Sequence, residues 1–243
     1  MISVYKNEGE TPLQCLERIR IEQNIGQDIP MTYAGRLDPM AEGVLVILVG
    51  EECKEKDKYL GLDKEYEFEI LVGFSTDTFD ILGEVVQSTN TINTDYIKFI
   101  KDALKSFTGK QIQSYPAFSS KTVDGVQLLT LARGNVLPEV LPSHEIQIHS
   151  IEILEERLVL KNDLQKDILN RIDKVSGDFR QDLIKTKWEE VLLSSHLSQF
   201  NIIRCRASVS SGTYIRQLVA DLSLKINIPL TTYTIRRTKI AIV

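Results

Sequence analysis

Strict alternation of apolar and polar residues predicts two strands with one buried face each. In residues 64–70 the aromatic and aliphatic side chains, Tyr66 among them, alternate with glutamates. Residues 201–209 repeat the pattern, with arginines at two of the polar positions. A period of two residues places all the apolar side chains on one face of a strand. Both segments are therefore expected to lie in a sheet whose other face is polar.

Other apolar runs predict further strands and a few helices. Residues 44–49 form a short apolar run bounded by glycines, which is typical of a buried strand. Thr11, Pro12 and Gln14 have the form of a helix start, with a capping hydroxyl and a glutamine three residues later. Because strands outnumber the helices that could cross between them, we predict an α+β fold, with residues 1–243 forming a single domain.

Residues 155–200 differ from the rest of the chain. Leu158, Leu164, Ile168 and Ile172 recur at helical spacings among many charged residues. We interpret this segment as a helical hairpin inserted between two strands. We expect it to be a solvated brace rather than part of a functional site.

A glycine-punctuated loop precedes the apolar run at 44–49 and carries a carboxylate at its centre. Asp38 is followed by Pro39, whose ring disfavours the helical region for the residue before it. A carboxylate on such a stiff loop beside a core strand is well placed for catalysis. It could equally cap a turn, as aspartate often does. The loop alone leaves both interpretations open.

Composition and targeting signals indicate a cytoplasmic protein with no metal site. The chain is 42% hydrophobic and 26% charged, and it contains no apolar run long enough to span a membrane. Residues 1–6 lack the pattern of a signal peptide. The three cysteines are scattered and odd in number, and the three histidines show no metal-ligand spacing, so neither disulfides nor a metal site is expected.

The charge is unevenly distributed. The formal net charge is −5, but residues 201–243 contain seven Lys and Arg against one Asp, which gives this segment +6 and the first 200 residues −11. A local cluster of cations is what binds phosphates, whatever the total charge. The segment therefore predicts either a phosphate-binding surface or a set of solvated arginines.

Six stretches of the chain share the motifs of one enzyme family, in the family's order. These are Val4-Tyr5-Lys6 with Gly9 and Thr11, Gly35 to Leu45, Asp63-Lys64 with Tyr66, Thr76 to Gly83, Gly212 to Arg216, and Leu230 with Arg236-Arg237-Thr238. Together they resemble the TruB family of tRNA pseudouridine synthases. One such motif would be weak, but six in register are strong.

The resemblance implies a mixed, largely antiparallel sheet flanked by helices, and a cofactor-free, metal-free isomerase. Its substrate would be the uridine at position 55, in the T-stem-loop of tRNA, and the enzyme would be a monomer. Asp38, Arg216 and Tyr66 fall on the family's catalytic aspartate, the arginine that pairs with it and the tyrosine that stacks on the base. The substrate-binding residues implied or expected are Tyr66, Tyr214, Leu230, Tyr33, Arg236 and Arg237.

In the loop around Asp38, three positions depart from the family pattern: Tyr33 stands where many members have His, Arg36 replaces Thr, and Glu42 replaces a small or hydroxyl residue. Gly-Arg-Leu-Asp also occurs in sister families that modify ribosomal RNA. Two alternatives therefore remain, a pseudouridine synthase acting on another RNA such as rRNA and a non-catalytic RNA-binding or tRNA-folding module. The chain is also expected to be a short form, without the C-terminal PUA-type RNA-binding domain of many relatives.

Overall fold

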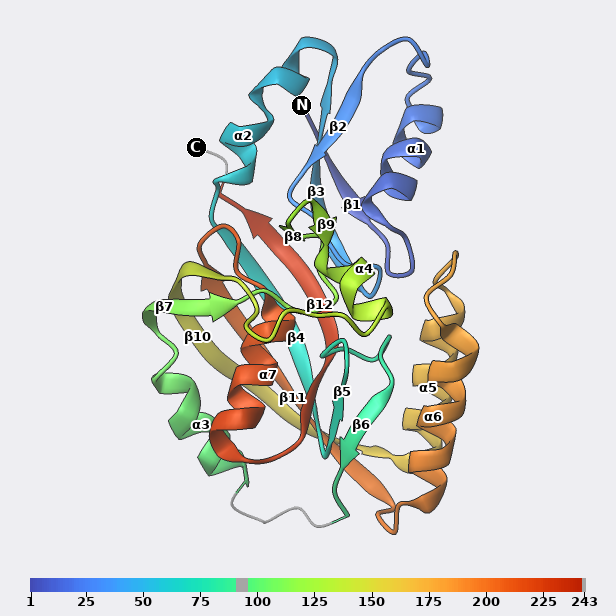
Figure 1. Cartoon of the computed structure of the whole chain (residues 1–243), viewed down its shortest axis with the longest axis vertical. Coiled ribbons are helices and arrows are strands. Elements are labelled where there is room, and N and C mark those ends of the chain that lie inside the picture. The colour runs from blue at the N-terminus through green and yellow to red at the C-terminus, as the bar shows by residue number, and fades with distance from the viewer. Residues whose placement is uncertain (91–95, 242–243) are drawn as a thin grey trace.

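A computed structural model of the chain describes residues 1–90 and 96–241 (Figure 1). The strands are β1 (Ile2–Lys6), β2 (Met31–Ala34), β3 (Ala41–Val49), β4 (Lys64–Val72), β5 (Phe74–Thr76), β6 (Val85–Ser88), β7 (Gly109–Ser114), β8 (Thr122–Val123), β9 (Val126–Gln127), β10 (Ser143–Leu160), β11 (Gln199–Val209) and β12 (Leu230–Ile240). The helices are α1 (Pro12–Glu22), the 3₁₀ helix η1 (Gly50–Glu55), α2 (Lys56–Leu60), α3 (Tyr96–Lys105), α4 (Leu128–Arg133), α5 (Lys161–Asp173), α6 (Gln181–Ser194) and α7 (Ile215–Ile226).

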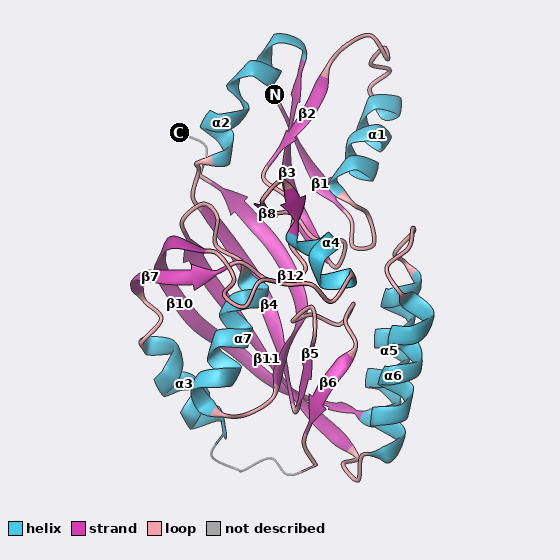
Figure 2. Cartoon of the chain, viewed as in Figure 1, coloured by secondary structure: helices cyan, strands magenta, loops and turns pink. Residues whose placement is uncertain are grey.

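One large mixed sheet organises the molecule. Its strand order is β1-β3-β12-β4-β11-β10-β7, and β2 pairs with β3. Every pairing in this sheet is antiparallel except that of β12 with β3, which is parallel. Helices flank the sheet (Figure 2). The expectation of a mixed, largely antiparallel sheet in an α+β fold is confirmed.

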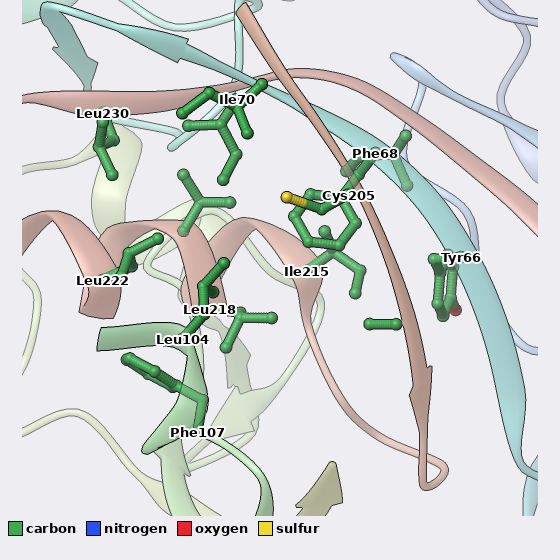
Figure 3. Packing of buried hydrophobic residues seen from close by; sticks show 14 of the residues in the cluster. Tyr66, Phe68, Ile70, Leu104, Phe107, Cys205, Ile215, Leu218, Leu222 and Leu230 are labelled. Atoms are coloured by element: carbon green, nitrogen blue, oxygen red, sulfur yellow. The ribbon is translucent and has the colours of Figure 1, made fainter. Parts of the chain in front are cut away.

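The strands predicted from alternation form the centre of the main core. Helix α7 lays Leu218 and Leu222 against Phe68 and Ile70 of β4 and Cys205 of β11, and all five side chains are buried (Figure 3). Full burial of one such aliphatic or aromatic side chain contributes about 1.5–3 kcal/mol. The core therefore fixes α7, and the loop that precedes it, against the middle of the sheet.

The helical hairpin is shorter than the sequence predicted. Strand β10 continues through Leu160 and pairs with β11 as far as Gln199, so residues 155–160 are strand and the helices occupy 161–194. Leu158, which fits the helical spacing in the sequence, lies on β10. The ladder of hydrogen bonds to β11 decides the conformation here, and a helical spacing of leucines carries no information about that ladder.

The expectation of a solvated excursion is also corrected. One face of the hairpin forms a second core, in which Leu164, Ile168 and Trp188 are fully buried. The Trp188 ring lies 5.3 Å from that of Phe74, and its Nε1 donates to the carbonyl oxygen of Ile81 at 3.1 Å. The hairpin is therefore packed against β5 and the loop after it.

Gly43 marks the closest approach between β3 and β12. Its φ is +111°, and a Cβ there would overlap the backbone of Arg237. Glycine is the residue that tolerates both the left-handed backbone and the missing space. The approach keeps the loop before β3 tight against β12.

Gly43→Ala is expected to destabilise the protein more than Gly109→Ala does. Gly109 has a similar φ of +107°, but no atom lies within 4 Å of its would-be Cβ. Strain at such a φ costs roughly 1–3 kcal/mol in both variants, and the overlap at Gly43 adds about another 1–3 kcal/mol. Urea denaturation measures the difference, and equal losses of unfolding free energy would contradict the close approach.

Candidate active site

A cleft of about 530 Å³ opens where the Asp38 loop, the start of β4 and the loop before α7 meet. The 76–82 loop, residues 118–120 and the tip of the helical hairpin complete its wall. Of the site residues predicted from the sequence, Asp38, Tyr66, Arg216, Tyr214 and Tyr33 all line it, and so does Arg237. Leu230 and Arg236 do not.

Asp38 faces this cleft and is paired with Arg216. The Nε of Arg216 donates to Oδ2 of Asp38 at 2.7 Å, and the Asp38 side chain remains 37% exposed. The loop around it is fixed by backbone hydrogen bonds from Ala41 N to Asp38 O, at 3.0 Å, and from Gly9 N to Pro39 O, at 2.8 Å. The carboxylate therefore has one oriented oxygen and one side open to a ligand.

Arg216 is buried and held at every nitrogen. Its Nη1 donates to Thr78 O at 2.6 Å and its Nη2 to Phe118 O at 3.2 Å. Its Nε lies 3.6 Å from Oδ2 of a second carboxylate, Asp80. Burial by itself would lower the pKa of Arg216, but Asp38 and Asp80 raise it above its usual range. The side chain is therefore a fixed cation between two acids.

Asp80 is a cleft residue that was not among the site residues predicted from the sequence. It is buried, and its Oδ1 accepts hydrogen bonds from Thr78 Oγ1 at 2.7 Å and from Leu82 N at 3.0 Å. Burial raises the pKa of its carboxyl to about 6; Arg216 opposes this effect, and Asp38 adds to it. The sequence does place Asp80 within the family motif from Thr76 to Gly83, but that motif by itself does not indicate that Asp80 pairs with Arg216.

Three tyrosines surround the carboxylate. Tyr66, on β4, is buried at the cleft wall, and Tyr214 immediately precedes α7. The Tyr214 ring meets Tyr115 edge-on at 5.8 Å, and Tyr115 in turn stacks on His144 at 4.2 Å. Tyr33 lies at the rim, with Lys56 Nζ 5.7 Å from its ring centroid. The site thus offers aromatic surfaces on several sides.

The expectation that Leu230 lines the pocket is wrong. Leu230 is buried at the start of β12, near Leu222 and Ile70 in the core (Figure 3). Five residues along the strand, or roughly 16 Å, Ile235 lies opposite Phe68 and lines the cleft. The apolar wall is therefore contributed by Ile235.

The two adjacent arginines of β12 have different positions. Arg236 is on the sheet surface, where its Nη2 donates to Glu67 at 2.6 Å. Arg237 is buried and donates to the carbonyl oxygens of Val44 at 2.7 Å, Arg36 at 3.3 Å and Gly35 at 3.4 Å. Although it lines the cleft, its guanidinium is occupied in holding the Asp38 loop. The expectation that Arg237 binds phosphate is therefore corrected: Arg237 positions the Asp38 loop.

Other cations of the C-terminal segment are also engaged. Arg204 pairs with Glu155 at 3.1 Å, Arg206 with Glu67 at 2.9 Å, and Lys239 lies 3.5 Å from Glu65. These pairs form a ladder of alternating charge across the polar face of the sheet. The excess of positive charge in residues 201–243 consequently does not form an unpaired basic surface.

Arg36 is the contrasting case. It is exposed and lines the cleft, and no ion pair to it occurs in the part of the chain that the structure describes. Among the three departures from the family pattern, Tyr33 and Arg36 line the cleft and Glu42 does not.

In residues 1–90 and 96–241, no group of three His, Cys, Asp or Glu side chains is arranged to hold a metal ion, and no helix is long and apolar enough to cross a membrane.

Sequence comparisons agree with the geometry. A family model described as TruB family pseudouridylate synthase (N terminal domain) matches residues 27–168. The chain is similar to tRNA pseudouridine synthase B of Limosilactobacillus reuteri (strain DSM 20016), with 29% identity over 94% of this chain and 63% of that protein. It is 30% identical to tRNA pseudouridine synthase B of Borreliella burgdorferi (strain ZS7), over 98% of this chain and 68% of that protein. The chain thus spans about two thirds of the length of these curated relatives.

A comparison of structures supports the fold. A crystal structure of a Cbf5-Nop10-Gar1 complex contains a chain that superposes with a TM-score of 0.58 at 18% identity, over 98% of this chain and 48% of that one.

Proposed function

The chain belongs to the TruB family of pseudouridylate synthases, and on this basis we propose that it is a pseudouridine synthase that isomerises a uridine in the T-loop of tRNA, at position 55. The single observation that carries the proposal is the Asp38 carboxylate, which faces the cleft while a buried arginine holds one of its oxygens at 2.7 Å. The names of the similar tRNA pseudouridine synthases support the substrate class.

The reaction requires a carboxylate but no external reagent. The N1–C1′ bond of uridine breaks, the uracil rotates, and a C5–C1′ bond forms; C5 loses a proton and N1 gains one, so the product is an isomer. Asp38 acts in its ionised form, either by attacking the nucleoside or by assisting elimination at the sugar. Arg216 orients Asp38 in both cases, through its hydrogen bond to Oδ2.

The base must leave its RNA stack to reach Asp38. Extrusion of a stacked nucleotide costs a few kcal/mol, and stacking on an aromatic side chain returns about 1–3 kcal/mol per base. Tyr66 supplies such a surface at the cleft wall, with Tyr214 and Ile235 beside it. We assign the stacking contact to Tyr66.

Arg36, an exposed cation of the cleft with no ion pair in residues 1–90 and 96–241, is where we expect an RNA phosphate to bind. Arg36→Ala is expected to weaken binding of a T-stem-loop and to reduce the slope of log K against log salt by about 0.7–0.9, the value of one lost phosphate contact. Filter binding at several salt concentrations measures both quantities. Arg204→Ala is the matched control, because Arg204 is ion-paired on the sheet face. An equal reduction in slope in both variants would mean that the RNA phosphates do not bind specifically at Arg36.

A tritium-release assay tests the proposed function directly. Wild-type protein is given a T-stem-loop labelled with tritium at C5 of uridine, and, in parallel, ribosomal RNA fragments. Release from the T-stem-loop alone supports the proposal. Release from ribosomal fragments alone would favour the alternative that Arg36 suggests, and tight binding without release from any RNA would favour a non-catalytic module.

We further propose that the protein acts in the cytoplasm as a monomer without a cofactor.

A further inference from the structure

The tip of the helical hairpin reaches into the wall of the cleft. Phe179 and Arg180, which connect α5 to α6, line the same cleft as Asp38. The hairpin is anchored on both sides, through Arg171, which donates to Glu8 at 2.7 Å, and through Trp188 Nε1, which donates to Ile81 O. Its tip is therefore held in place rather than free in solvent.

Arg180 contacts two segments that lie far apart along the chain. Its Nη1 donates to Asp77 Oδ2 and to Glu84 Oε1, at 2.8 Å each. Its guanidinium carbon also lies 4.7 Å from the centroid of the Phe118 ring. The hairpin tip is also joined to α4, because Arg133 Nη2 donates to Asp178 O at 2.7 Å. A planar guanidinium can pair with carboxylates along its edge while it stacks through its face.

The same two segments provide the carbonyl oxygens that hold Arg216. Arg216 donates to Thr78 O, adjacent to Asp77, and to the carbonyl oxygen of Phe118 itself. Arg216 is thus oriented by two backbone carbonyl groups. Arg180, on the hairpin, contacts Phe118, which carries one of these groups, and Asp77, the residue before the one that carries the other. The hydrogen bond from Arg216 Nη2 to Phe118 O is the longer of the two, at 3.2 Å. A small displacement of Phe118 would therefore break it first.

We propose that Arg180 is a positioning residue for the reaction: it fixes Asp77 and Phe118, and thereby the carbonyl groups that orient Arg216 against the catalytic carboxylate of Asp38. The inference rests on the proposed function and gives the hairpin a role in it. Arg180 touches neither Asp38 nor Arg216, so its effect passes through the loops. A shift of about 1 Å in a catalytic group can cost about 10²-fold in rate.

Arg180→Ala is therefore expected to lower the single-turnover rate on saturating T-stem-loop by about 10²-fold. RNA affinity in filter binding should change less than about threefold, because the phosphate contacts remain. Arg180→Lys keeps the charge for Asp77 and Glu84 but lacks the planar face, so an intermediate loss is expected. Phe118→Leu should lower the rate in the same direction, and the double variant should lose less than the product of the two single losses.

Lys185→Ala is the matched control. Lys185 lies on the same hairpin, pairs with Asp173 at 2.7 Å, and is not among the residues that line the cleft. Its removal tests whether any lost ion pair on the hairpin slows the reaction. A full single-turnover rate in Arg180→Ala, or an equal fall in Lys185→Ala, would overturn the proposal.

A structural readout separates this inference from the proposed function. If wild-type protein releases no tritium, the proposed function fails, and crystal structures of wild type and Arg180→Ala decide the positioning role. The proposal requires Phe118 O to move beyond about 3.5 Å from Arg216 Nη2 in the variant, out of hydrogen-bond range. An unchanged Arg216 in that structure would contradict it.

Discussion

Asp38→Asn is expected to lower the rate of pseudouridine formation by at least about 10³-fold while RNA binding persists. Asparagine keeps the shape of the side chain and can still accept the hydrogen bond from Arg216 Nε, but it has no charge to attack the nucleoside or to assist elimination. Tritium release from C5-labelled T-stem-loop measures the rate, and filter binding measures the affinity. The comparison isolates the negative charge of Asp38 from its contacts.

The control for this variant is Asp102→Asn, which changes an exposed carboxylate on α3 that pairs only with Lys105 among the described residues. It should leave both the rate and the affinity unchanged. Asp38→Asn protein that still converts uridine at a rate near that of wild type would remove Asp38 from the mechanism.

Arg216→Met is expected to destabilise the protein by about 3–5 kcal/mol at neutral pH and to abolish turnover. The Arg216 side chain is 3% exposed and Asp80 is 8% exposed, so methionine would leave a buried carboxylate without its cation. The carbonyl oxygens of Thr78 and Phe118 would lose their donor as well. Urea denaturation at pH 8 measures the loss of unfolding free energy.

The cost of Arg216→Met should fall as the pH is lowered. In the wild type, burial already raises the pKa of Asp80 to about 6, above its usual value of 3.8, and loss of Arg216 raises it further. The folded state then binds a proton that the unfolded state releases, so unfolding free energy rises as the pH drops from above the folded pKa towards 4. Denaturation at pH 5 and pH 8 should show a smaller deficit at pH 5; a deficit independent of pH would mean that Asp80 is not the group left uncompensated.

Several features of the fold and site followed from local patterns. The alternation at 64–70 and 201–209 identified two central strands, because a half-buried strand requires apolar side chains at every second position. Gly35 and Pro39 around Asp38 indicated a stiff loop, because they restrict or permit particular backbone angles. The family motifs then brought Asp38, Tyr66 and Arg216 to one site, and the structure places all three in the cleft.

Features that depend on pairing between distant segments could not be predicted from those local patterns. Residues 155–160 are strand because β11 supplies their hydrogen bonds, and Ile235 rather than Leu230 reaches the cleft because of the register of β12 on β4. Arg236 and Arg237 are neighbours in sequence, yet one pairs with Glu67 on the surface and the other is buried behind the Asp38 loop.

By itself, the sequence determined the residue types of the catalytic loop and the faces of its strands, since these depend on steric preferences and on burial within a few residues. Only the tertiary structure decided which carboxylates share Arg216, which cations remain unpaired, and that the hairpin tip reaches the cleft through Arg180. Electrostatic pairing and close packing depend on distances between segments far apart along the chain, and local periodicity carries no information about those distances.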